Sequence, residues 1–187
     1  MTLDDVRADA FRRLSDGAAR PKSPFRNPVL ATVDRQGLPN VRTVVLRGFD
    51  PATRVLTAHS DVRAPKIEEL RAEPRVMLHA WDAHDQVQVR ILARASLCLG
   101  EAAKPDWGRL HPGSRATYAV APLPSTPLDD PAVADQQRLP ESEAFLNFAV
   151  IEAVMDSLDW LCLARTGNRR ARFTWIGGDE HATWLVP

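Results

Sequence analysis

The chain has 187 residues and a hydrophobic fraction of 44%, which suits one domain with a proper core. Lysine plus arginine equals aspartate plus glutamate at 24 each, and this zero net charge argues against a nucleic-acid-binding protein. Neither cysteine belongs to a CxxC pair, and neither a signal peptide nor a membrane-spanning apolar run is present, so we expect a cytoplasmic protein without membrane contact.

The first predicted element is a helix over residues 1–20. Thr2 is a suitable N-cap, and Pro21 follows the end of the helix. One face carries apolar residues at helical spacing, namely Leu3, Val6, Ala10 and Leu14. We expect this helix to pack on a sheet and to carry no chemistry.

A hairpin is predicted next, with strands over 29–33 and 40–47 joined by a turn over 34–37. In the second strand, Arg42 and Arg47 lie on opposite faces, each among apolar neighbours. A guanidinium in that setting needs a fixed anionic partner, because burying it unpaired is costly. The alternative is an edge strand with surface arginines.

A short strand over 54–59 is followed by a helix with Pro65 at its first position and Pro74 beyond its end. Arg63 and Lys66 flank the start of this helix. Cations are disfavoured there unless an anion is also present, so together with the backbone N–H groups they could form a phosphate site. The alternative is two solvated cations.

Two more strands are predicted over 76–81 and 86–97, with a turn over 82–85. Gln88 lies on the polar face of the second strand, where its amide could contact a heterocycle or simply face water. Many strands separated by short turns indicate a sheet closed into a barrel with attached helices.

Helical segments are predicted over 101–110 and 112–120, followed by a proline-rich loop over 121–140 that is a candidate binding loop. Residues 145–155 fit a helix or a strand equally well. Beyond a predicted turn at Asp156-Ser157, we expect strands over 158–162, 169–176 and 181–187. Arg169, Arg170 and Arg172 need anions or solvent.

Several common motifs are absent from the sequence. We find no GxGxxG after a strand, no GxxxxGK[ST] and no GxSxG. The five histidines show no metal-ligand spacing, so no metal is expected. Nothing indicates a Ser/His/Asp triad, and no catalytic residue can be named.

The order of several short motifs resembles the pyridoxamine 5'-phosphate oxidase family over residues 25 to 187. These motifs are Ala31-Thr32-Val33-Asp34 with Gly37, the stretch 42–47, Arg63 and Lys66, Glu73-Pro74, Trp81 with Gln88-Val89-Arg90, the stretch 168–173 and the closing Trp184-Leu185-Val186-Pro187. Each motif is weak alone, and their collinearity carries the resemblance. The 107–125 region is more similar to the family's short FMN-binding members than to the vitamin-forming enzyme.

The resemblance implies a mainly β fold with peripheral helices, a six-stranded antiparallel split β-barrel forming one domain over 1–187. It implies a homodimer with FMN between the subunits. The FMN-binding residues that it implies are Arg42, Thr43, Val44, Val45, Leu46, Arg47, Thr57, Ala58, Arg63, Lys66, Gln88, Ser125 and Arg172. These include the cations for which the sequence suggests no other partner.

The substrate-binding residues that the resemblance implies are Trp107, His111, Arg115 and Arg170. This chain departs from the family pattern at Arg47, where the family has lysine, and at Asn168 and Arg170, where it has an Arg-x-His pair. The implied function is an FMN-dependent oxidoreductase that moves a hydride from a small substrate to flavin N5. The alternatives are a non-catalytic flavin-binding module and a haem-handling relative.

Overall fold

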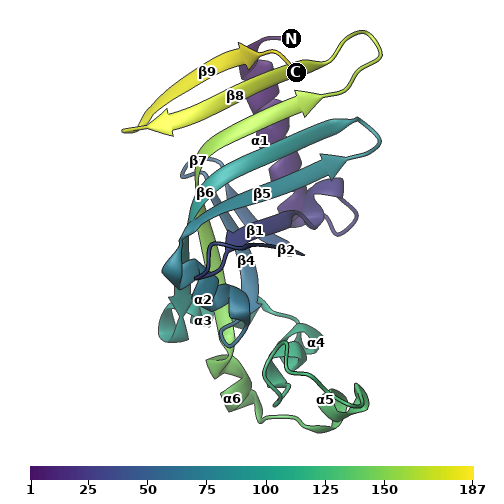
Figure 1. The fold of residues 1–187 in the computed structure, drawn as a ribbon, viewed down its shortest axis with the longest axis vertical. Coiled ribbons are helices and arrows are strands. Elements are labelled where there is room, and N and C mark those ends of the chain that lie inside the picture. Colours follow the sequence, from purple (N-terminus) through teal and green to yellow (C-terminus); the bar gives the residue numbers. More distant parts are fainter.

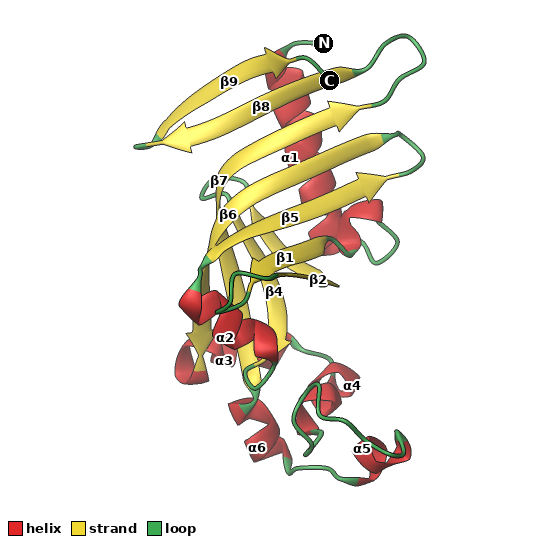
Figure 2. Cartoon of the chain, viewed as in Figure 1, coloured by secondary structure: helices red, strands yellow, loops and turns green.

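The computed structural model describes residues 1–187 as one open antiparallel sheet with helices attached (Figure 1, Figure 2). The strands are β1 (Val29–Val33), β2 (Pro39–Thr43), β3 (Leu46–Asp50), β4 (Val55–Asp61), β5 (Arg75–Asp82), β6 (Val87–Leu99), β7 (Phe148–Cys162), β8 (Arg169–Ile176) and β9 (Asp179–Leu185). The helices are α1 (Leu3–Ala19), α2 (Pro65–Ala72), α3 (Lys104–Arg109), α4 (Pro112–Arg115), α5 (Ala132–Gln136) and α6 (Glu141–Leu146), with 3-10 turns η1 (Pro24–Arg26), η2 (Gly100–Ala103) and η3 (Ala116–Ala119).

The strand order explains how the sheet curls. Seven strands run in the order β2-β1-β5-β6-β7-β4-β3, and β8 pairs with β7 and with β9. The two ends of the path, β2 and β3, are joined by Val44-Val45 alone, so they must lie close together although no ladder connects them. The sheet is therefore a barrel left open along that seam, and the predicted split-barrel class is confirmed.

The predicted single strand over 40–47 is wrong in one respect, because it is two strands. Thr43 ends β2 and Leu46 begins β3, and the N–H of Val44 bonds to the carbonyl of Pro28. Together with the C-terminal β8–β9 hairpin in the same sheet, this division gives nine strands instead of six.

The N-terminal helix is confirmed, with Thr2 capping it. The Thr2 hydroxyl accepts from the N–H of Asp5, whose carboxylate accepts from the N–H of Thr2. The helix buries Val6, Ala10 and Leu14 against the core and crosses behind the strands in Figure 1. The opposite side of β5–β8 carries no helix.

Two further predictions need correction. The predicted turn at Asp156-Ser157 lies inside β7, which is continuous. Leu92 pairs with Ser157 and Ala93 with Met155, so Asp156 is the extra residue of a β-bulge. The predicted loop over 121–140 contains α5, and its ends are held together by bonds from the Ala121 N–H to Gln137 and from the Leu139 N–H to Ala119.

The stretch 145–155, which fits a helix or a strand equally well by sequence, contains the end of a helix and the start of a strand. Helix α6 ends at Leu146 and β7 begins at Phe148. Phe148 joins Trp107, Leu110 and Ala144 in a second, smaller core beneath the sheet. None of the helices is both long and apolar enough to cross a lipid bilayer.

Candidate functional site

Strand β4 separates the core of the barrel from the candidate site. Along this strand burial alternates, so Leu56 and Ala58 face the core, whereas Thr57, His59 and Asp61 point to the other side. Two cavities lie against that second side. We call them the loop cavity and the cationic cavity, and His59 lines both.

The loop cavity has a volume of about 460 Å³ and lies between the end of β4 and the proline-rich segment. Arg63 and Ser125 both line it, so the structure brings these two predicted FMN residues together. The Arg63 guanidinium donates to both carboxylate oxygens of Asp61, at 3.0 and 2.7 Å, and these bonds raise the pKa of Arg63. It also donates to the carbonyls of Val120 (2.9 Å) and Ala121 (3.2 Å), which fixes the start of the loop.

The cationic cavity has a volume of about 480 Å³ and brings together two more predicted FMN residues, Arg47 and Thr57. Its lining holds three guanidiniums against one carboxylate, and its full lining is Arg26, Arg47, Gly48, Thr57, His59, Asp106, Arg109 and Leu110. Arg109 forms an ion pair with Asp106 at 2.8 Å, whereas no carboxylate lies within 4.0 Å of Arg47.

His59 is the most unusual group of the site. Its side chain is 8% exposed, and neither ring nitrogen has a hydrogen-bond partner. Burial, together with the positive charge of Arg47, lowers the pKa of His59 to about 4. The ring is therefore neutral at pH 7 and lies edge-on to Phe148, with 4.9 Å between the ring centroids.

A third group of predicted residues lies where β2 meets α2. The Arg42 guanidinium bonds to the buried Glu69 carboxylate at 2.9 Å and to the Thr32 hydroxyl. Lys66, in the first turn of α2, donates to the Ser60 hydroxyl at 3.1 Å and has no carboxylate within 4.0 Å. Burial, with the nearby Arg42 charge, lowers the pKa of Lys66.

The side chains of the remaining predicted FMN residues in the 42–58 region do not line the loop cavity or the cationic cavity. Val44, Leu46 and Ala58 are buried in the core, Val45 is partly buried and Thr43 is exposed. Any contact of the buried three with a cofactor would have to use the backbone.

Gln88, Arg170 and Arg172 lie elsewhere, on the uncovered face of the sheet. The Gln88 amide oxygen is 3.2 Å from Nε2 of His79. Arg170 and Arg172 both bond to Asp159, whose carboxylate also lies 3.3 Å from Arg90. Burial alone would raise the pKa of Asp159, but the bonds from Arg170 and Arg172 outweigh it and hold the pKa below its usual value.

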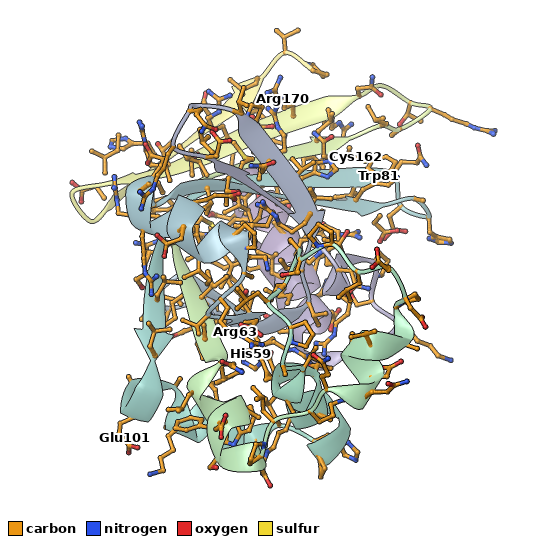
Figure 3. All side chains as sticks on the ribbon, turned by 60° about the horizontal axis from the view of Figure 1, so that its bottom comes forward. His59, Arg63, Trp81, Glu101, Cys162 and Arg170 are labelled. Atoms are coloured by element: carbon orange, nitrogen blue, oxygen red, sulfur yellow. The ribbon has the colours of Figure 1, made fainter.

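These residues cannot reach the cavities of their own chain. Thr57 pairs with Glu152 and Gln88 pairs with Leu161, both on β7, and about 30 Å of extended strand separates those two positions at 3.3 Å per residue. In Figure 3, His59 and Arg63 lie close together in the lower half of the view, whereas Trp81, which pairs with Gln88, and Arg170 lie in the upper half. The predicted FMN residues therefore form two sets within one chain. One set lies near β4 and α2, and the other lies on the uncovered face of the sheet.

The predicted substrate residues of the 107–115 region have structural roles. Trp107 is buried in the smaller core, and Nδ1 of His111 accepts from the N–H of Gly113. Arg115 forms an ion pair with Glu141 at 3.0 Å, bonds to the Trp107 carbonyl and lies over the Trp107 ring.

Sequence reasoning missed four residues that the structure places at these sites, namely Arg26, His59, Arg109 and Asp159. The sequence could have indicated His59, because His59 lies two residues after Thr57 and therefore on the same face of β4. The premise that the predicted cations lack protein partners is wrong for Arg42, Arg63 and Arg172, each of which bonds to a carboxylate.

Comparison with known proteins gives a consistent family. Residues 9–98 match the model of the pyridoxamine 5'-phosphate oxidase FMN-binding domain. The pyridoxine/pyridoxamine 5'-phosphate oxidase of Xylella fastidiosa strain Temecula1 is 31% identical over 142 residues, which cover 68% of this chain and 67% of that protein. Oxidase 2 of the same name from Arabidopsis thaliana is 28% identical over 165 residues, covering 83% and 82%.

Solved structures show the same fold. An FMN-binding protein related to pyridoxamine 5'-phosphate oxidase from Nostoc punctiforme superposes with a TM-score of 0.82 at 21% identity, with both chains covered completely. PhzG from Burkholderia lata, in complex with tetrahydrophenazine-1-carboxylic acid, gives a TM-score of 0.77 at 19% identity and covers 99% of this chain and 96% of that one.

Proposed function

The chain belongs to the pyridoxamine 5'-phosphate oxidase family and its cofactor is FMN, and from this premise we propose that it is an oxidoreductase acting on a small anionic substrate. The observation that carries the proposal is the pair of adjoining cavities on β4, which gather the predicted FMN residues Arg47, Thr57, Arg63 and Ser125 around His59.

The residues present fit FMN. A phosphate dianion is a strong acceptor for charged donors, and Lys66 and Arg47 are cations without a carboxylate partner. His59, which lines both cavities, has two buried ring nitrogens without partners in the protein. We assign Arg63, Lys66 and Ser125 to the phosphate end, and Arg47 and Thr57 to the remainder of the cofactor.

When bound, FMN supplies a ring that accepts a hydride from the substrate. The protein therefore has to bind the cofactor and the substrate, orient them and exclude water. Asp61 orients Arg63, and Arg63 in turn holds the loop at Val120 and Ala121 over the cavity. Because His59 is uncharged at pH 7, we assign it to positioning and not to acid–base catalysis.

We further propose that the active form is a homodimer. One chain cannot supply Thr57 and Gln88 to the same cofactor across about 30 Å of strand, whereas a second copy could. An apolar row runs from Val41 on β2 through Ala31 on β1 to Met77 on β5 and Leu92 on β6. The exposed fractions are 69% for Val41, 37% for Met77 and 38% for Leu92. A second copy would bury this row.

The enzyme proposal is tested on purified protein by absorbance and anaerobic reduction. We expect a flavin spectrum that bleaches with pyridoxamine 5'-phosphate, with a reduced phenazine carboxylate, or with another amine or nicotinamide cofactor. The named substrates follow from the relatives' names. A flavin that none of these reduces would indicate a non-catalytic flavin-binding module, and a Soret band in its place would indicate a haem-handling protein.

The dimer proposal is tested with mixed dimers of Arg63→Ala and Gln88→Ala subunits. If each site takes Arg63 from one subunit and Gln88 from the other, a mixed dimer has one intact site and one doubly altered site. We then expect half of the flavin to bind as tightly as in the wild type. Uniform weakening of both sites would contradict the shared arrangement, as would a monomer in analytical ultracentrifugation.

A further inference from the structure

Gln88 has a hydrogen-bond partner on the uncovered face of the sheet that the resemblance does not include. His79 on β5 lies diagonally across from Gln88 on β6, and Nε2 of the His79 ring is 3.2 Å from the Gln88 amide oxygen. Both side chains are half-buried. Because an amide oxygen can only accept, Nε2 carries the hydrogen in this pair and His79 is the donor.

The other polar neighbours of Gln88 favour the same orientation of its amide. Trp81 pairs with Gln88 across the ladder, and Arg90 lies two residues beyond Gln88 on the same face. Neither an indole nor a guanidinium can accept a hydrogen bond. The carboxylate of Asp159, opposite Arg90, already accepts bonds from two arginines of β8. The amide of Gln88 is therefore surrounded mainly by donors, and its oxygen is the end that they favour.

This arrangement leaves the NH2 group of Gln88 without an acceptor in the chain, since the contact with His79 is the only hydrogen bond of the amide. The two N–H groups are free to donate to an acceptor from outside the chain. A flavin ring offers such acceptors at its carbonyl oxygens and its unprotonated ring nitrogens.

We infer that His79 is a positioning residue for Gln88. By holding the amide oxygen, His79 makes Gln88 present its N–H donors, and not its carbonyl, to the flavin ring bound by the other subunit. The inference rests on the proposed function, because Gln88 reaches a cofactor only in the proposed dimer. His79 itself acts through Gln88 and does not have to touch the cofactor.

A donor at the edge of the ring favours the reduced cofactor over the oxidised one. A hydride brings negative charge to the ring, and hydrogen bonds to a charged acceptor are about twice as strong as bonds to a neutral one. If the amide of Gln88 were released from His79, it could turn its oxygen to the ring and lose this preference. His79 therefore influences the reduction potential of bound FMN through the orientation of Gln88.

The test measures the midpoint potential of bound FMN at pH 7 in His79→Leu, in Gln88→Leu and in the double variant. We expect His79→Leu to weaken the binding of reduced FMN about tenfold relative to oxidised FMN, the effect of one hydrogen bond to a charged group. This change lowers the midpoint potential by about 30 mV. His84→Leu is the matched control, because His84 is 94% exposed in the turn between β5 and β6 and bonds to Asp85.

The double variant separates positioning from a direct effect of His79. If His79 acts through Gln88, removing both side chains lowers the potential no more than Gln88→Leu does alone. Additive shifts would show that His79 acts on the ring by itself and would overturn the inference, as would an unchanged potential in His79→Leu. His79→Gln keeps an N–H donor at similar reach, and its potential should lie nearer to the wild type than that of His79→Leu.

Titration of each FMN-free variant with FMN, followed by the quenching of flavin fluorescence, distinguishes failure of the inference from failure of the proposed function. If Gln88→Leu shifts the potential and His79→Leu does not, the proposed function stands and the inference fails. If Gln88→Leu changes neither the potential nor the affinity for FMN, Gln88 does not contact the cofactor, and the proposed dimer and the inference fail together. A wild-type protein that binds no FMN refutes both.

Discussion

Replacing Asp159 by asparagine removes the charge on which three arginines converge. The Asp159 carboxylate is 8% exposed and bonds to Arg170 at 3.0 and 2.9 Å and to Arg172 at 3.1 Å, with Arg90 at 3.3 Å. Arg90 belongs to β6 and the other two to β8, so this one side chain connects three neighbouring strands. Asp159→Asn keeps the volume and removes the charge.

The magnitude follows from what remains unpaired. Three bonds between charged groups, each contributing about 1.5–3 kcal/mol, are weakened in the variant. The arginine side chains are 25–45% exposed and recover part of this from water. We therefore expect the free energy of unfolding to fall by about 2–4 kcal/mol, near the lower end of the range for a broken buried ion pair.

Urea unfolding of FMN-free protein at pH 7, followed by tryptophan fluorescence, measures this loss. Asp156→Asn is the matched control, because Asp156 lies in the same strand at the bulge. We expect the control to keep the wild-type midpoint. Equal midpoints for both variants would show that water already solvates the three arginines, which would refute the reasoning.

Three further predictions concern the cofactor, the buried histidine and two glycines. Lys66→Met should weaken FMN retention in dialysis more than Arg63→Ala. Lys66 uses only one of its three hydrogen-bond donors, on Ser60, whereas Arg63 already uses four of its five within the protein. Arg138→Ala, which removes a loop arginine that lines neither cavity, is the control. Acidification from pH 6.5 to 4 should lower the free energy of unfolding by about 2–3 kcal/mol through His59, because the unfolded ring, with a pKa of 6.5, takes up a proton that the folded ring, with a pKa of about 4, rejects. In His59→Leu this part of the pH dependence should vanish, and an unchanged slope would mean that the ring is not buried. Gly17→Ala should destabilise by about 1–3 kcal/mol in thermal unfolding, since a Cβ there would lie 2.6 Å from the Phe25 carbonyl oxygen. Gly108→Ala, where nothing lies within 4 Å, should stabilise by up to about 1 kcal/mol.

Most strands could be predicted because one side of this sheet is buried and the other is not. The alternation of Val76 and Leu78 with Met77 and His79 is the direct consequence of that burial. Asp156-Ser157 has the composition of a turn, but β6 continues opposite it and supplies partners on both sides of the bulge. The division of 40–47 has no local signal, because the residues on both sides of Val44-Val45 favour extended backbone and only the curl of the whole sheet decides which strand each half joins.

The residue types of the candidate site could be predicted from the sequence, but the carboxylates that pair with its arginines mostly could not. Arg63 has its carboxylate two residues away, at Asp61, and that pair could have been recognised. Arg42 finds Glu69 on α2, and Arg172 finds Asp159 on the neighbouring strand β7. These pairings depend on register and on helix placement, which sequence periodicity does not specify.

One strand, β7, links the two halves of the proposed cofactor site. Its first half pairs with β4 beside the cavities, and its second half pairs with β8, where Asp159 holds Arg170 and Arg172. Because the halves are far apart on a rigid ladder, bending one chain cannot join them. In the twofold dimer that we propose, each chain would give its cavities to one site and its arginine face to the other, so that the two halves would meet at both sites. The carboxylate-bound arginines are then held in place before any partner arrives, and the entropic cost of ordering them is already met within each chain.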